Sequence, residues 1–209
     1  PAAPPAAGEP TTLLRWFSEF CRRLEEGVYV RRPLLPEAGA QTTGVSLFPT
    51  AGEEVSRCVT RGVEVSASAV FMPEHRGGWG YSIALRLVAT AEERGFQTCQ
   101  LSTRQWEIGE EGREPGVVNG EGVIGLFPIL ADGGWICNAA SDPHGQYEDG
   151  AGFRDGEFRY QSCTGGLASM RGSFAGSLRF VPGTRASPRA EPFDARLAPF
   201  SLHMPEYLF

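Results

Sequence analysis

The sequence predicts an all-β fold, an antiparallel β-sandwich preceded by a single helix. Three observations lead to this prediction. Apolar and polar residues alternate along several segments, Gly- and Pro-rich turns separate those segments, and helical spacing ends near residue 27. The contents of 27 Gly and 16 Pro are high for a helical protein and normal for a turn-rich β protein. Six or seven short strands without intervening helices favour two packed sheets.

The N-terminal part of the chain predicts a linker, a helix and an irregular connection. Residues 1–10 are a Pro/Ala linker with nothing to bury. Residues 11–27 follow with apolar residues at helical spacing, so we expect a helix that Thr12 caps and Gly27 ends. Its apolar stripe consists of Leu13, Trp16, Phe17, Phe20 and Leu24. Residues 28–50 show no regular period.

The strand pattern begins after residue 57. Apolar residues fall at every second position in residues 63–71 and 79–89, and the intervening "PEHRGG" predicts a loop that joins two antiparallel strands. In the first of these strands, Glu64, Ser66 and Ser68 share the polar face. Turn signals separate the further strand candidates, which are residues 99–108, 157–164, 176–183 and 193–204. Residues 131–156, rich in Gly and Asp, predict a mobile insertion between two strands.

Charge and cysteine content exclude several classes of protein. A net charge of −6 argues against binding to nucleic acid or to an anionic membrane, because either partner attracts a positively charged protein surface. The 5 cysteines are an odd number without a C-x-x-C pair, so we expect neither a disulfide scaffold nor a zinc site. No apolar run approaches the ~20 residues of a membrane span. A cytoplasmic or nuclear location fits these features.

The stretch "VVNGEGVIGLFPIL", residues 117–130, carries glycines at the spacing of a dinucleotide-binding loop, Gly120, Gly122 and Gly125. We reject that interpretation, because Pro128 lies where a helix should follow and the chain has no βαβ alternation. Two alternatives stay open. The glycines supply turns and close backbone approach, or the turn directs backbone N–H groups at an anion.

The anion alternative has a candidate set of residues. It consists of Arg104, Gly120, Glu121, Gly122 and Gly125, with Arg104 expected to face outward near the turn and Trp106 expected in the core. Trp135 and Phe153 in the predicted insertion either anchor a partner or pack back onto the sandwich. The sequence shows neither a metal-ligand spacing nor a catalytic motif such as G-x-S-x-G, so we expect a non-catalytic binding module with no metal and no cofactor.

Several short motifs, in order, resemble the ApaG domain family over roughly residues 45–209. The motifs are "VSASAVFMPEH", "YSIALRL", "CQLSTRQWEI", "GEGVIGLFPIL", "FRYQSCT", "GSFAGSLRFVPG" and the closing "FSLHMPEYLF". The variant most similar is the ApaG-containing F-box protein of plants and animals, of the Skp1-interacting type. Residues 11–44 resemble the end of the Smi1/Knr4-type domain that precedes ApaG in those proteins. The insertion at about 131–156 departs from the family.

The resemblance implies an immunoglobulin- or fibronectin III-like sandwich. It also implies that the domain is the substrate-recognition module of an F-box subunit in a Skp1–cullin–F-box E3 ubiquitin ligase. The implied partners are target proteins for ubiquitination, and Skp1 through an F-box that would precede Pro1; nucleic acid and membrane are not expected. The alternative implied by the family is a sensor domain that binds a small anion, pyrophosphate or a nucleotide, and is linked to divalent-metal tolerance.

Overall fold

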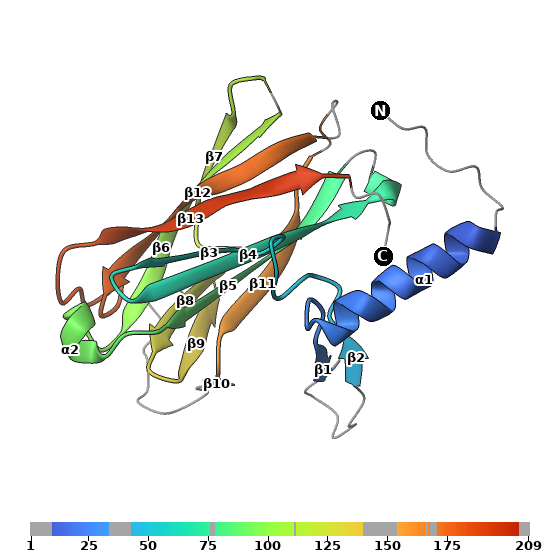
Figure 1. Cartoon of the computed structure of the whole chain (residues 1–209). Coiled ribbons are helices and arrows are strands. Elements are labelled where there is room, and N and C mark those ends of the chain that lie inside the picture. The colour runs from blue at the N-terminus through green and yellow to red at the C-terminus, as the bar shows by residue number, and fades with distance from the viewer. Residues whose placement is uncertain are drawn as a thin grey trace.

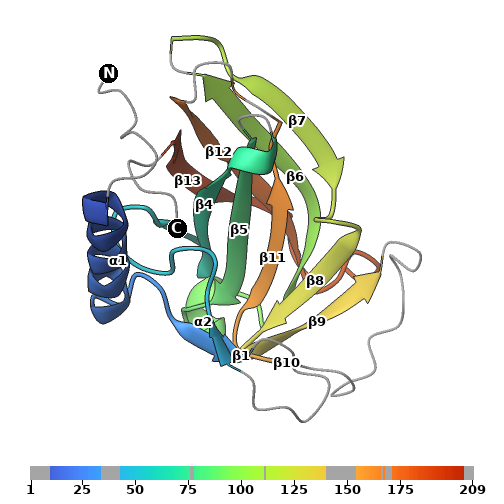
Figure 2. The same ribbon diagram turned by 90° about the vertical axis from the view of Figure 1, so that its right-hand side faces the viewer.

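The structure is a computed structural model that describes residues 10–33, 43–75, 78–110, 112–139, 154–165, 167 and 171–204. Within these residues, two antiparallel sheets pack face to face and a helix lies beside them (Figure 1). Figure 2 shows the same sheets turned by 90°, with the helix again beside them. The predicted antiparallel β-sandwich is therefore confirmed.

The two sheets divide the strands as follows. The smaller sheet has the order β11-β5-β4-β3, and the larger has the order β10-β9-β8-β6-β12-β13 with β7 also paired to β6. The smaller sheet contains β3 (Ser56–Thr60), β4 (Val63–Met72), β5 (Gly78–Leu87) and β11 (Phe158–Cys163). The larger contains β6 (Cys99–Glu110), β7 (Gly116–Glu121), β8 (Leu126–Ala131), β9 (Gly134–Ala139), β10 (Arg154–Asp155), β12 (Arg171–Pro182) and β13 (Phe193–His203). Two short helical turns, η1 (Pro73–His75) and α2 (Ala91–Arg94), follow β4 and β5.

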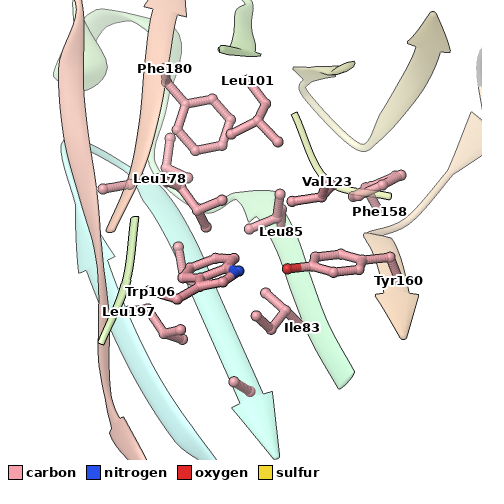
Figure 3. Close-up of a cluster of buried hydrophobic side chains, with 14 of the residues drawn as sticks. Ile83, Leu85, Leu101, Trp106, Val123, Phe158, Tyr160, Leu178, Phe180 and Leu197 are labelled. Atoms are coloured by element: carbon pink, nitrogen blue, oxygen red, sulfur yellow. The ribbon is translucent and has the colours of Figure 1, made fainter. Parts of the chain in front are cut away.

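The core lies between the sheets and follows from the alternation in the sequence. In β4, Val63 and Val65 point inward and are 0% exposed. They pair with Leu87 and Leu85 of β5, which confirms the predicted hairpin. In Figure 3, side chains of both sheets meet across the core, with Ile83 and Leu85 on one side and Trp106, Leu178 and Phe180 on the other. Each fully buried side chain of this size stabilises the fold by roughly 1.5–3 kcal/mol.

The N-terminal region forms a helix and a small ribbon. The predicted helix is confirmed as α1 (Pro10–Glu25), and Gly27, with φ of +73°, follows its end as expected. Thr12 is not the cap, because the helix begins at Pro10, a residue that suits a first turn. The connection expected to be irregular contains a two-stranded ribbon of β1 (Arg31–Pro33) and β2 (Thr43–Val45).

The predicted insertion at 131–156 is wrong at its start. Strand β9 lies there and pairs along its whole length with β8, after a tight turn at Asp132 and Gly133. The alternation in "GWICNA" is too weak to mark a strand, and β9 is stabilised by its pairing with β8. At the other end, β10 pairs with β9. Residues 140–153 lie outside the described residues.

Candidate functional site

The glycine motif forms a tight backbone turn between β7 and β8. Val123 and Leu126 exchange two backbone hydrogen bonds, of 2.9 and 2.8 Å. The two residues between them, Ile124 and Gly125, have φ angles of +44° and +78°. This is the pattern of a type I′ turn, in which both central residues adopt positive φ. No helix follows Gly125, so the rejection of a dinucleotide-binding fold is confirmed.

Close packing requires glycine at position 122. Its φ is +54°, and a Cβ atom there would lie 2.4 Å from the carbonyl oxygen of Leu126. The backbone N–H of Gly122 donates to Ser102 O at 2.9 Å. The N–H groups of Val123 and Leu126 are used within the turn itself. Three N–H groups that could face an anion are therefore already hydrogen-bonded, which favours the structural explanation of the glycines. Anion binding at this turn remains a prediction.

Arg104 lies beside the glycines, but the prediction that it faces outward is wrong. It pairs directly with Leu178, which is fully buried, and directly paired residues share one face of a sheet. Trp106, two residues further along β6, lies on the same face and is 3% exposed, as expected for the core. The Arg104 guanidinium lies over Gly120, where a Cβ would be 2.6 Å from Nη1.

The hydrogen bonds of Arg104 stabilise the turn. Its Nη1 donates to the carbonyl oxygens of Glu121 and Gly122, at 3.1 and 2.8 Å. The structure thus brings Arg104, Gly120, Glu121 and Gly122 together, with Gly125 at the tip of the same turn. In this arrangement Arg104 satisfies the hydrogen-bonding capacity of two backbone carbonyl oxygens and holds the turn against β6.

On the opposite, outer face of the larger sheet, β6, β7, β12 and β13 line a groove of about 480 Å³. Its described charged lining consists of Arg104 and Arg179, with Glu121 and Asp194, and Arg104 contacts backbone carbonyl groups. Arg179 lies 3.5 Å from Asp194, and the Glu121 carboxylate, which is 70% exposed, lies 3.6 Å from Arg185. The remaining lining is polar and includes Thr103, Gln105, Asn119 and Ser177. Such a groove can accept a polar peptide, but it carries no excess charge.

The predicted partner anchors lie in different situations. Trp135 is a half-buried residue of β9, and its ring packs edge-on against Phe158 with 5.0 Å between ring centroids. It therefore packs back onto the sandwich, one of the two alternatives open from the sequence. Phe153 lies outside the described residues.

A second polar site, on the outer face of the smaller sheet, was missed from the sequence. The alternation correctly places Glu64, Ser66 and Ser68 on one face, but that face is not solvent-exposed. These three residues are only 8%, 7% and 1% exposed. The chain before β3 covers them: Ser68 Oγ donates to Pro49 O at 2.7 Å, and Thr50 N donates to Val28 O at 2.7 Å. The predominance of small serines on this face is the one signal that could have indicated a covered surface.

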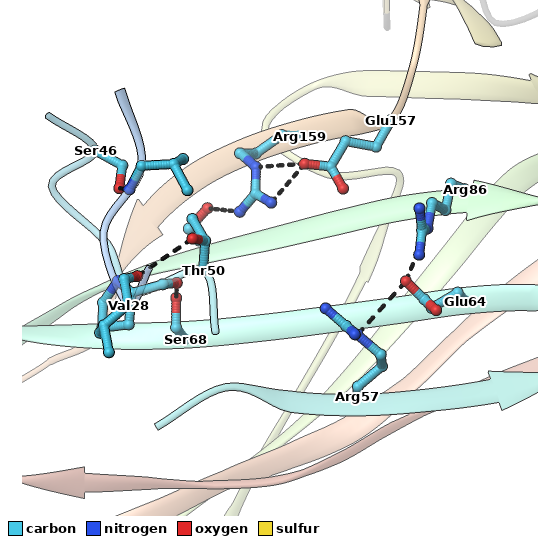
Figure 4. Close-up of polar contacts among 12 residues, drawn as sticks. Val28, Ser46, Thr50, Arg57, Glu64, Ser68, Arg86, Glu157 and Arg159 are labelled. Atoms are coloured by element: carbon cyan, nitrogen blue, oxygen red, sulfur yellow. Dashed lines mark hydrogen bonds and ion pairs between the residues drawn. The ribbon is translucent and has the colours of Figure 1, made fainter. Parts of the chain in front are cut away.

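The covered face contains two groups of ion pairs, shown in Figure 4. In the first, Glu64 accepts a hydrogen bond of 2.8 Å from Arg86 Nε and lies 3.6 Å from Arg57 Nε. This hydrogen bond raises the pKa of Arg86 further above its ordinary value. In the second group, Arg159 donates to Glu157 at 2.6 and 3.2 Å.

The described residues also bear on metal binding and membrane insertion. Nowhere within them do three or more His, Cys, Asp or Glu side chains gather closely enough to hold a metal ion. Among the described helices, none combines the length and hydropathy needed to cross a membrane.

Fold and sites together define a small antiparallel β-sandwich domain that presents a polar groove on one outer face and an arginine-rich pocket on the other. The chain belongs to the ApaG family. The family model described as "ApaG domain" matches residues 72–135. The ApaG protein of Anaeromyxobacter dehalogenans is 30% identical over 72% of this chain and 97% of its own length.

Two relatives carry the domain within longer proteins. "F-box protein SKIP16" of Arabidopsis thaliana is 31% identical over 94% of this chain and 42% of its own length. "F-box only protein 3" of Homo sapiens is 24% identical over 58% of this chain and 24% of its own length. The chain therefore spans less than half of either F-box protein.

Proposed function

We propose that this chain is the target-recognition domain of an F-box protein that brings proteins to a Skp1–cullin–F-box ubiquitin ligase. The observation that carries the proposal is the similarity to F-box protein SKIP16 over 94% of this chain, and the similarity to F-box only protein 3 supports it. In this proposal the domain binds target proteins without a catalytic step, Skp1 binds through an F-box elsewhere in the protein, and the protein acts in the cytoplasm or nucleus.

The surface of the larger sheet supports a role in protein binding. Within the described strands, β7 pairs only with β6, so its other edge is open. Three apolar residues on and next to this strand are exposed, Val117 by 54%, Val118 by 48% and Ile124 by 56%. An open strand edge flanked by apolar side chains is suited to pair with an extended peptide segment of another protein.

We assign residues 11–44, in the same proposal, to the end of a preceding domain of the Smi1/Knr4 type. Helix α1 keeps Leu13, Leu14 and Phe17 exposed by 68%, 66% and 56%. An amphipathic helix gains most of its stability from packing its apolar face, so these residues are suited to contact a further part of the protein. Residues 45–209 then form the ApaG domain proper.

The experiment compares the full F-box protein with a variant that lacks residues 45–209. Ubiquitylated proteins that co-purify with each are identified by mass spectrometry, and co-purified Skp1 is the control for the F-box. We expect the deletion to remove the ubiquitylated targets and to leave Skp1 binding unchanged. Recovery of the same targets with and without the domain would overturn the proposal.

A further inference from the structure

The pocket on the outer face of the smaller sheet has the properties of a binding site for an anionic group. It encloses about 250 Å³, and its lining includes Arg57, Arg86 and Arg159 together with Glu64 and Glu157. This volume is below the roughly 300–1,000 Å³ of sites for drug-sized ligands, so the pocket suits a single small group. Pro49 and Thr50 form part of its wall, which makes it a partly covered pocket and not an open sheet face.

The charges that line the pocket do not cancel. Among the described residues of the lining, three arginines face two carboxylates, which gives a local charge of +1 in a chain whose net charge is −6. Glu64, whose side chain is 10% exposed, is shared by Arg57 and Arg86. One carboxylate neutralises only one guanidinium, so the pair of arginines keeps an unbalanced positive charge. The Arg57 and Arg86 side chains are 55% and 48% exposed, so this charge is accessible to a group that approaches from solvent.

Two of the arginines also have N–H donors that make no hydrogen bond within the described residues. A guanidinium carries five N–H donors. Arg86 donates its Nε to Glu64, whereas the Arg57 guanidinium makes no hydrogen bond to any described residue, because its Nε lies 3.6 Å from the Glu64 carboxylate. Arg159 is held in place by Glu157 and by Ser82 Oγ, which accepts from Nη1 at 2.9 Å. The pocket thus combines one anchored guanidinium with two that still present their Nη groups.

We propose that this pocket binds a phosphate group carried on a phosphorylated side chain of a target protein, with Arg57 and Arg86 as its direct ligands. The planar fork of a guanidinium matches two phosphate oxygens at once, which is why arginine clusters recognise phosphorylated peptides. Arg159 and the buried serines shape the pocket around this group. The inference rests on the proposed function, because it names the chemistry by which targets are selected.

The test uses the purified chain and a degenerate peptide library with one fixed phosphoserine. The same library treated with phosphatase is the first control. The chain is expected to retain the phosphorylated library and not the dephosphorylated one, and inorganic phosphate at tens of millimolar is expected to displace the retained peptides. Equal retention of both libraries, or no displacement by inorganic phosphate, would overturn the proposal.

Two variants separate the pocket from general electrostatic attraction. Arg57→Gln removes the guanidinium that makes no hydrogen bond within the described residues, and we expect retention to fall at least about tenfold, because charge-assisted hydrogen bonds to the phosphate are lost. Arg179→Gln is the matched control: Arg179 is 50% exposed, close to the 55% of Arg57, and is likewise paired with a carboxylate. Equal loss in both variants would overturn the assignment. Unchanged thermal unfolding verifies that each variant folds.

The outcome is independent of the ubiquitin-ligase experiment. If the deletion experiment fails while the wild-type chain retains phosphopeptides and Arg57→Gln does not, the pocket stands and the receptor role is wrong. If targets are lost on deletion while the two libraries bind equally, the receptor role stands and the pocket proposal is wrong.

Discussion

The glycine turn offers a direct test of whether its glycines are structural, through the substitution Gly122→Ala. An L-residue at the observed φ of +54° costs about 1–2 kcal/mol, and a Cβ placed 2.4 Å from Leu126 O forces the turn to shift, at a further cost of about 1–3 kcal/mol. We therefore expect a loss of about 3 kcal/mol in the free energy of unfolding. In a chain of this length such a loss lowers Tm by roughly 6–12 °C.

The matched control for this substitution is Gly133→Ala. Gly133 also has positive φ, at +76°, but a Cβ there would meet no atom within 4 Å. Only the backbone strain remains, so we expect a loss of about 1 kcal/mol. Urea unfolding, measured by tryptophan fluorescence, gives both values. Equal losses in the two variants would refute the argument from close packing. A rise in wild-type Tm with pyrophosphate that Gly122→Ala abolishes would support the anion alternative instead.

Two further predictions concern buried polar groups and thiols. The Tyr160 hydroxyl is buried without a hydrogen-bond partner among the described residues, and burial raises its pKa well above the ordinary value. We expect Tyr160→Phe to leave the free energy of unfolding unchanged or to raise it by up to about 1 kcal/mol in urea unfolding, whereas a loss of that size would contradict this. Cys99 is 0% exposed and burial raises its pKa, whereas Cys163 is exposed. We expect a thiol reagent to label Cys163 in the native protein and Cys99 only after unfolding, with mass spectrometry of the peptides as the measurement; equal labelling rates would contradict the described burial.

The sequence predicts the parts of this fold that depend on local pattern. Alternation identifies the hairpin of β4 and β5, because every second side chain of both strands enters one core. A single residue, Pro128, is enough to exclude a helix after Gly125, because proline disrupts the interior of a helix. Strand β9 escapes prediction, because its weak pattern becomes a strand only through pairing with β8.

The candidate site was predicted less well, for two separate reasons. Residues two apart in a strand share a face, so the expected burial of Trp106 already implied that Arg104 faces inward. The covered face of β4 is a different case. Alternation correctly separates Glu64 from Val63 and Val65, but it assigns the polar side to solvent. Only the folded chain shows that residues distant in sequence cover it, as in the contact of Ser68 with Pro49.

The two outer faces of the sandwich differ in how their charges are balanced, and this difference bears on which face selects a partner. In the groove of the larger sheet, two cations of the described lining, Arg104 and Arg179, face two carboxylates, Glu121 and Asp194, so these charges cancel. In the pocket of the smaller sheet, Arg57 and Arg86 share Glu64. Because exposed ion pairs add little net attraction, a groove with matched charges discriminates among partners mainly by shape and hydrogen bonding. The described lining of the pocket carries a net positive charge, so it favours a partner that supplies an anion.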